Sequence, residues 1–387
     1  MSNFGIVCEF NPLHNGHVRL FGEARELGAE RIVCVMSGNA VQRGELAVFD
    51  KYKRAEAALR CGADLVIELP FPWSSASAEY FSRAAVSLLS HFCTDILFGS
   101  ECGDVEALKS AAKRANDERF REEFRRRTES GERAAKIYFE MLSGDGNIEF
   151  SSNDLLGIEY IRAIAAQDLH INIHTVKREG ADYNDTELGT SSCPSATALR
   201  TVWQDGSFEK SERYMPREAY EIFERAYFDG EMTDIYQLSR AILAYFRLQS
   251  PETLENIAEA QGGIANRICA LSHESASLEE LMEKLSTKRY TDAKLRRAML
   301  FCMCSVSREL LESMPEYTTL LAANAKGREL LSLARKDCGV KIVTKPADAP
   351  TKSEQYAASQ RLDAIFTLAK MQTAESSEYL KKSAFIE

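Results

Sequence analysis

The first two hundred residues of this chain alternate between short apolar runs and segments with helical periodicity. The apolar runs lie at residues 4–8, 31–37, 63–70, 95–99 and 171–177. The segments between them place apolar residues at helical spacing, as at 18–27, 51–61, 76–91 and 153–166. Continuous apolar strands separated by helices are typical of a parallel sheet covered on both faces. We therefore expect an α/β fold whose ligand site lies beyond the carboxyl ends of the strands.

The turn after the first run carries a pair of histidines around a glycine, His14-Asn15-Gly16-His17. The helix that follows would offer unpaired N–H groups and a partial positive charge to a phosphate. Gly16 allows a close backbone approach, and both imidazoles can donate hydrogen bonds. With 6 His and 21 Gly in 387 residues, His-x-Gly-His is expected by chance about 0.005 times. We interpret the turn as a phosphate site rather than as a loop with two surface histidines.

Composition limits the class of protein. A chain of 387 residues with 45% hydrophobic and 27% charged residues can form two or three globular domains. It has neither an apolar stretch of membrane-spanning length nor a basic–apolar leader, so a cytoplasmic protein without a membrane partner is expected. Ten cysteines without metal-ligand spacing predict reduced thiols and no metal held by the protein. The net charge of -10 argues against indiscriminate nucleic-acid binding but leaves room for a local basic surface.

The pattern changes after about residue 204. Helical periodicity dominates, at 217–227, 233–246, 278–285 and 292–304, followed by a small αβ piece with strands at 318–322 and 341–343 around a helix at 327–335. We expect one domain over residues 1–204 and a mainly helical region over 205–387. Within the first domain, residues 106–127 predict one long charged helix with a solvated face, and the polar segment 180–193 a loop over the site.

Two separated segments resemble the paired signatures of a superfamily. Besides the histidine motif, Ser195-Ala196-Thr197-Ala198-Leu199-Arg200 resembles the second signature of nucleotidyltransferases with a His-x-Gly-His motif. The resemblance implies a Rossmann-like nucleotidyltransferase domain in which this helix start holds the nucleotide phosphates from the opposite side. It also implies nucleophilic attack on the α-phosphate of ATP, with pyrophosphate leaving.

Further segments are similar to one bacterial family, the tRNA(Met) cytidine acetate ligases, over about residues 4–350. They are residues 9–17, Met36-Ser37-Gly38, Gln42-Arg43-Gly44-Glu45, residues 64–70, Phe98-Gly99-Ser100-Glu101, residues 152–157, Lys177-Arg178, residues 288–291 and residues 344–348. The resemblance implies ATP-dependent activation of acetate as acetyl-adenylate, with Mg²⁺. It then implies acetylation of N4 of the wobble cytidine of elongator tRNA(Met).

The resemblance also implies roles for individual residues. The expected catalytic groups are His14, His17 and Arg200. The expected ATP contacts are Val7, Cys8, Glu9, Phe10, Asn11, Pro12, Leu13, His14, Asn15, Gly16, His17, Val18, Arg19, Leu20, Gly99, Ser100, Asn153, Lys177, Arg178, Ser195, Thr197 and Arg200. Plain structural roles compete for some of them, because Arg200 could close a surface ion pair and Asn153 could cap a helix. We expect Lys51, Lys53 and Arg54 on a solvated helix face, and His91, His170, His174 and His273 in structural positions.

A basic segment stands out in the second half. Residues 285–300 carry a local charge near +4, and on charge alone this is equally typical of a snorkelling helix surface and of an RNA contact. The family resemblance favours contact with tRNA(Met) through Lys288, Arg289, Tyr290, Lys294 and Arg297. Two other functions remain open, a small-molecule adenylyltransferase of the same superfamily and a non-catalytic protein that binds ATP and RNA.

Overall fold

The computed structural model describes residues 2–130, 132, 134–144, 149–178, 194–287, 290–334, 339–375 and 384–387. The expected loop at 180–193 lies outside these residues, as do Lys288 and Arg289. No helix in the described part of the chain is long and apolar enough to cross a membrane.

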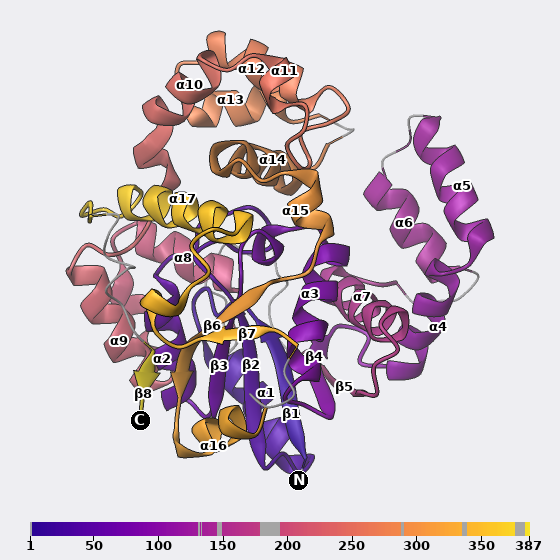
Figure 1. Ribbon diagram of the computed structural model, residues 1–387, viewed down its shortest axis with the longest axis vertical. Helices are drawn as coiled ribbons and strands as arrows, with labels where there is room; N and C mark the ends of the chain where they lie inside the picture. Colours follow the sequence, from indigo (N-terminus) through magenta and orange to yellow (C-terminus); the bar gives the residue numbers. More distant parts are fainter. Residues whose placement is uncertain are drawn as a thin grey trace.

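One mixed sheet forms the centre of the molecule (Figure 1). Its order is β5-β4-β1-β2-β3-β6-β7, with β8 paired to β6. The five strands of the first half pair in parallel, as the apolar runs predict. The bounds are β1 Asn3–Cys8, β2 Arg31–Ser37, β3 Leu65–Leu69, β4 Asp95–Ser100, β5 Asn172–Lys177, β6 Tyr317–Ala323, β7 Lys341–Val343 and β8 Phe385–Ile386. The chain proceeds outward from β1 to β2 and β3 on one side, and then to β4 and β5 on the other. The switch point between β1 and β4 is where an open α/β sheet binds its ligand.

Helices cover both faces of the sheet and bury two separate apolar clusters. One cluster includes Phe81, Leu88 and Ile161, and the other includes Phe21, Trp203 and Phe223. The helices of the first half are α1 Asn15–Glu26, α2 Lys51–Arg60, α3 Ala78–Ser90, α4 Val105–Ala115, α5 Glu118–Glu129, α6 Ala134–Ser143, α7 Ser152–Ala166 and α8 Ala196–Gln204. Those of the second half are α9 Arg217–Phe228, α10 Ser239–Arg247, α11 Pro251–Leu254, α12 Ile264–His273, α13 Leu278–Leu285, α14 Asp292–Cys304, α15 Arg308–Glu312, α16 Ala325–Ala334 and α17 Glu354–Leu368. Short 3₁₀ segments lie at η1 Trp73–Ser75, η2 Phe208–Tyr214, η3 Ile235–Leu238 and η4 Pro346–Asp348.

The division expected at residue 204 does not separate two hydrophobic cores. Strand β6 from the second half pairs antiparallel with β3, so the small αβ piece extends the main sheet. Gly327 at the start of α16 lies so close to this edge that an added Cβ would stand 2.0 Å from the carbonyl oxygen of Asp64. Both apolar clusters contain residues from each side of 204. Helices α10 to α14 bury a third cluster of their own above the sheet (Figure 1).

The charged stretch expected as one helix forms two. Helix α4 ends at Ala115, and α5 begins after Asp117, whose side chain accepts a hydrogen bond from the backbone N–H of Arg119. Asp in this position favours an N-cap over a helix interior, which interrupts the run. None of the residues of α5 is buried, so the expected solvated face is confirmed.

Candidate active site

The first turn of α1 combines both histidines with the helix amino terminus. His14 is the N-cap, and its Nδ1 accepts a hydrogen bond from the backbone N–H of Gly16 at 3.1 Å. The Nδ1 of His17 accepts one from the backbone N–H of His14 at 3.2 Å. The two rings lie with their centroids 3.9 Å apart. This reciprocal capping fixes both imidazoles at the carboxyl end of β1, beside the switch point of the sheet.

Both histidines are neutral at pH 7. Burial lowers the pKa of His14 to about 3, and the charge of Arg178 adds to this effect. Burial, with smaller contributions from His14 and Arg178, lowers the pKa of His17 well below its usual range. A neutral imidazole whose Nδ1 accepts a hydrogen bond carries its proton on Nε2. Each ring therefore has an N–H donor at Nε2 for an anionic group.

The preceding segment supports this turn from inside the core. Phe10 adopts a left-handed backbone conformation with φ of 45°, and its buried ring packs edge-on against His17. Leu13 is fully buried, and the side chain of Asn11 accepts a hydrogen bond from the backbone N–H of Val48. The side chains of Phe10, Asn11 and Leu13 thus hold the loop in place, and the expected ATP contacts at these three positions stay a prediction.

The second signature lies against the first. Ser195 caps α8, because its Oγ accepts a hydrogen bond from the backbone N–H of Ala198 at 3.0 Å. From the first turns of this helix, Arg200 donates through Nη1 to the carbonyl oxygen of Asn11 at 2.8 Å. Its Nη2 lies 3.3 Å from Oγ1 of Thr197 and 3.4 Å from Oε2 of Glu45. The guanidinium does form an ion pair, as the alternative interpretation held, but it also attaches α8 to the histidine loop.

A second polar group lies at the ends of β4 and β5. The backbone N–H of Arg178 donates to the carbonyl oxygen of Ser100, and its guanidinium lies 3.5 Å from Glu101. Asn153 donates through Nδ2 to the same Glu101 carboxylate at 2.5 Å. Ser151, rather than Asn153, is the N-cap of α7, so the capping role considered for Asn153 is wrong. The side chain of Arg178 covers Gly99, where an added Cβ would come within 3.1 Å of its Cγ. Lys177 is exposed next to it.

Two acidic residues complete the arrangement without having been assigned a role from the sequence. Glu45 pairs with Arg200 and also, through Oε1, with Arg296 of α14 at 3.3 Å. Glu101 pairs with Arg178 and Asn153. Both glutamates lie in segments that carry the family resemblance, and this was the feature of the sequence that could have indicated them as site residues. Their partners come from distant parts of the chain, so spacing alone could not reveal them.

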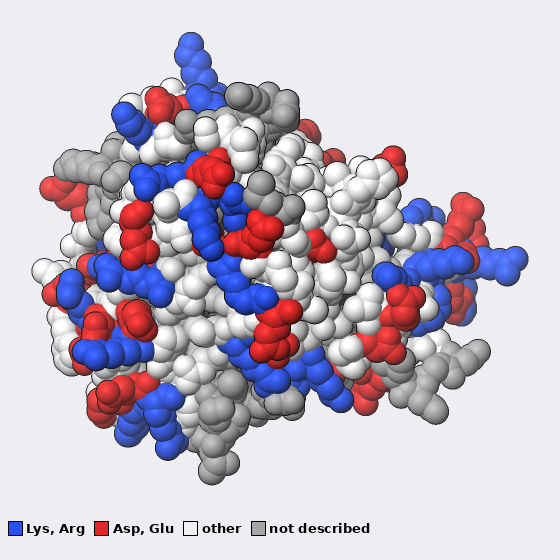
Figure 2. Space-filling view, turned by 90° about the horizontal axis from the view of Figure 1, so that it is seen from below, with Lys and Arg blue, Asp and Glu red and all other residues white. Residues whose placement is uncertain are grey.

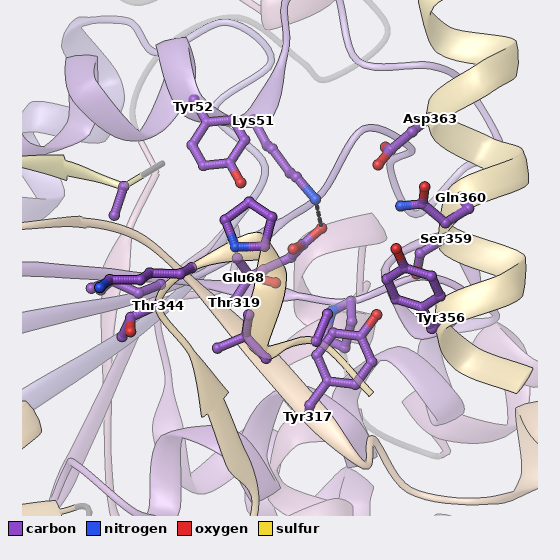
Figure 3. Close-up of a pocket in the computed structure, with 17 residues that line it drawn as sticks. Lys51, Tyr52, Glu68, Tyr317, Thr319, Thr344, Tyr356, Ser359, Gln360 and Asp363 are labelled. Atoms are coloured by element: carbon purple, nitrogen blue, oxygen red, sulfur yellow. Dashed lines mark hydrogen bonds and ion pairs between the residues drawn. The ribbon is translucent and has the colours of Figure 1, made fainter. Parts of the chain in front are cut away.

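The expectation that Lys51 and Arg54 lie on a solvated face is wrong. The ammonium of Lys51 is buried and lies 2.7 Å from Oε1 of Glu68 (Figure 3). Asp363 of α17 faces the same cavity of about 60 Å³ and accepts a hydrogen bond from Asn39. Burial lowers the pKa of Lys51, but the carboxylates of Glu68 and Asp363 outweigh this and raise it overall.

Arg54 is fully buried and binds backbone carbonyls rather than a ligand. It donates to the carbonyl oxygens of Phe49 at 2.9 Å and Ser37 at 3.1 Å, and also to those of Glu9 and Gly38. Glu9 follows β1, whereas Ser37 ends β2 and Gly38 and Phe49 lie in the segment after it, so Arg54 joins the two loops at the carboxyl edge of the sheet. It therefore positions the loop that leads into the histidine motif.

The structure divides the basic segment of the second half. Arg297 is buried on α14 and forms a two-pronged ion pair with Glu259, so its expected place on an RNA-binding surface is wrong. Lys294 is partly exposed and lies over the ring of Tyr290, whose hydroxyl donates to the carbonyl oxygen of Gly262. The opposite end of the molecule, seen in Figure 2, carries acidic and basic side chains interspersed. The face drawn in Figure 2 therefore does not present a uniformly basic surface to an RNA strand.

Comparison with known proteins identifies the family of the chain. The model of the HIGH nucleotidyl transferase family matches residues 1–381. A tRNA(Met) cytidine acetate ligase of Clostridium perfringens is 33% identical over 374 residues, which are 91% of this chain and 92% of the relative. One of Fervidobacterium nodosum is 34% identical over 357 residues, covering 89% and 84%. The chain belongs to the tRNA(Met) cytidine acetate ligase family.

Membership of this family confirms the resemblance found in the sequence, and a solved structure confirms the fold. Thermotoga maritima TmcAL, crystallised with alpha-thio ATP, matches with a TM-score of 0.89 and 30% identity, covering 100% of both chains. A relative of the same architecture thus binds an ATP analogue. In the family member described here, the two signatures meet at the switch point of the sheet.

Proposed function

We propose that this protein is an ATP-dependent ligase that joins acetate to N4 of the wobble cytidine of elongator tRNA(Met). The observation that carries the proposal is the meeting of His14, His17 and Arg200 around one loop at a helix amino terminus. Two Nε2 donors and a guanidinium at the positive end of a helix together suit a triphosphate better than any uncharged ligand. The names of the relatives supply the acceptor and the acid.

The proposed reaction has two steps. An acetate oxygen attacks the α-phosphorus of ATP, the bond to pyrophosphate breaks, and acetyl-adenylate forms. N4 of the cytidine then attacks the acetyl carbon, the bond to the adenylate oxygen breaks, and AMP and a proton leave. In the first step, His17 donates from Nε2 to the α-phosphate and Arg200 holds the outer phosphates, so charge is neutralised by groups already in place.

The remaining contacts follow the same placement. The helix start at Ser195 and Thr197 contributes further donors to the phosphates, and the group at Gly99, Asn153 and Arg178 lines the adenosine side of the switch point. Mg²⁺ enters with ATP and is held chiefly by phosphate oxygens. As a tRNA-modifying enzyme, the protein acts in the cytoplasm.

The RNA side of the proposal lies in the region after residue 204. Lys288, Arg289, Tyr290 and Lys294 follow the RNA backbone, whereas Arg297 supports α14 from within. Each phosphate neutralised by a lysine or arginine releases counterions, so this part of the interface makes tRNA binding dependent on salt.

Incubation with labelled acetate, ATP and purified tRNA(Met) tests the proposed function. We expect ATP- and acetate-dependent label in the tRNA, with release of pyrophosphate and AMP. Pyrophosphate release with another acid or phosphorylated substrate, and no labelled tRNA, would instead identify a small-molecule adenylyltransferase. Absence of ATP turnover with every acid tested would identify a non-catalytic binding protein.

A further inference from the structure

A cavity of about 300 Å³ opens beside the proposed ATP site, between the α/β core and the helices of the second half. Its polar wall is one face of α8, formed by Thr197, Arg200, Thr201 and Gln204, with Glu45 from the neighbouring loop. These α8 positions are three or four residues apart, so they share one side of the helix. The same guanidinium that contacts the histidine loop therefore also borders this cavity.

Most of the remaining wall is apolar. It includes Ile242 of α10, Leu278 and Met282 of α13, and Met299, Leu300 and Met303 of α14. Tyr236 of η3 also lines the cavity and is 47% exposed. Thioether side chains adapt their shape to flat rings and make favourable sulfur–aromatic contacts. A triphosphate would lose its hydrogen bonds to water against such a wall and gain none in return. The cavity therefore suits a flat ring whose faces contact the apolar residues and whose one polar edge contacts α8 and Glu45.

We infer that this cavity binds the unstacked cytosine of the acceptor RNA. The inference rests on the proposed function and assigns it a nucleobase site. The volume is at the lower end of the range for small-ligand pockets, and is sufficient for one base with part of its ribose. Chemistry on a nucleobase requires that the base leave its stack and enter such a pocket between apolar and aromatic side chains.

The position of the cavity agrees with the second reaction step. N4 of the cytidine must reach an acetyl group attached at the α-phosphate beside the histidine turn. Arg200 lines the cavity and contacts the loop before that turn, at the carbonyl oxygen of Asn11, so the cavity and the turn are neighbours. The carboxylate of Glu45 faces the cavity between Arg200 and Arg296. A carboxylate accepts hydrogen bonds from the exocyclic amine of cytosine, whereas uracil presents an acceptor there. The site therefore favours cytosine over uracil.

The RNA strand would enter from α14. This helix follows the basic segment and provides three of the apolar residues of the cavity. Lys294 is at its start, and Arg296 is joined to the loop of the core through Glu45 and the carbonyl oxygen of Arg43. A strand that follows these cations along the outside of α14 delivers one base over Tyr236.

Methionine methyl NMR tests the site independently of catalysis. With methionines labelled at the methyl carbon, we add an anticodon stem–loop of tRNA(Met), and a matched RNA that lacks the base at the wobble position. The signals of Met282, Met299 and Met303, assigned through Met→Leu variants, should shift with the first RNA and not with the second. Equal shifts with both RNAs, or shifts with ATP alone, would overturn the assignment.

Two variants connect the cavity to activity. Met303→Trp fills it and Tyr236→Ala removes its exposed ring. Phe228→Ala is the control, because it removes an exposed ring on α9 that does not line the cavity. Acetate-dependent exchange of pyrophosphate into ATP, measured without RNA, should be unchanged in all three. Transfer of acetate to tRNA should fall about 5- to 150-fold in kcat/KM for the first two variants only, the range expected when one base stack is removed.

The outcomes separate the two proposals. Full transfer by Met303→Trp, within twofold of the parent protein, would overturn the base site and leave the proposed function intact. A parent protein that transfers no acetate, but whose three methionines respond to the wobble base, would overturn the proposed reaction and leave the base site intact.

Discussion

Replacing Asp363 by Asn should change how the stability of the protein depends on pH. Burial raises the pKa of Asp363 to about 6 from an ordinary 3.8, with the charges of Lys51 and Glu68 acting in opposite directions. The folded state therefore binds this proton more tightly than the unfolded chain, and stability is lost as the pH rises from about 4 to about 6. The full cost of ionisation is about 3 kcal/mol, and about 1.4 kcal/mol of it falls between pH 5 and pH 7.5.

Urea unfolding of both proteins at pH 5 and pH 7.5, followed by the fluorescence of the buried Trp73 and Trp203, measures this difference. Relative to the parent protein, Asp363→Asn should gain about 1.4 kcal/mol more at pH 7.5 than at pH 5. Asp229→Asn, which removes an exposed carboxylate, is the matched control and should show no such change. A pH-independent effect of Asp363→Asn, or a gain at pH 5 instead, would refute the reasoning.

Three further predictions concern the candidate site and its surroundings. His17→Ala should lower the rate of acetate-dependent AMP formation by about 10²–10³-fold. His17→Gln keeps an acceptor for the backbone N–H of His14, so it should keep the stability of the parent protein but show the same loss of turnover. Near-parent turnover in both variants would remove His17 from the catalytic groups. Replacing Lys288, Arg289 and Lys294 by Ala should reduce the salt dependence of tRNA binding by about one log–log unit for each phosphate that no longer has a cationic partner, without affecting pyrophosphate exchange; an unchanged slope would exclude the segment from the interface. Arg297→Ala should instead destabilise the fold by about 3–5 kcal/mol, because Glu259 loses its buried partner; a lowered salt slope at unchanged stability would contradict this.

Local pattern was sufficient for the parts of the fold that local forces determine. The strand, histidine turn and helix at residues 3–26 need only an apolar run, a cap and a periodic segment, and they form as predicted. The same is true of the helices at 278–285 and 292–304, whose bounds are confirmed. The cap at Ser195 is likewise a matter of neighbouring residues.

The errors arise where a residue's partner lies far away in the sequence. Lys51 looks like a surface residue until Glu68 of β3 and Asp363 of α17 enclose it. In the sequence, Arg297 looks like part of a basic patch, but in the folded chain it pairs with Glu259. The apolar sequence of β6 would suit a strand of a separate domain equally well. Its pairing with β3 shows that it extends the main sheet. No periodicity in the chain carries such information.

The origin of the oxygen in AMP tests the central claim most directly. With acetate labelled by ¹⁸O in its carboxylate, attack on the α-phosphate at the histidine turn transfers one labelled oxygen to the adenylate. That oxygen stays with AMP when N4 of the cytidine takes the acetyl group. We predict one ¹⁸O in each AMP released. In His17→Ala, the rate of labelled AMP release and the rate of tRNA acetylation should fall together. Unlabelled AMP, or label recovered in the pyrophosphate, would contradict the account.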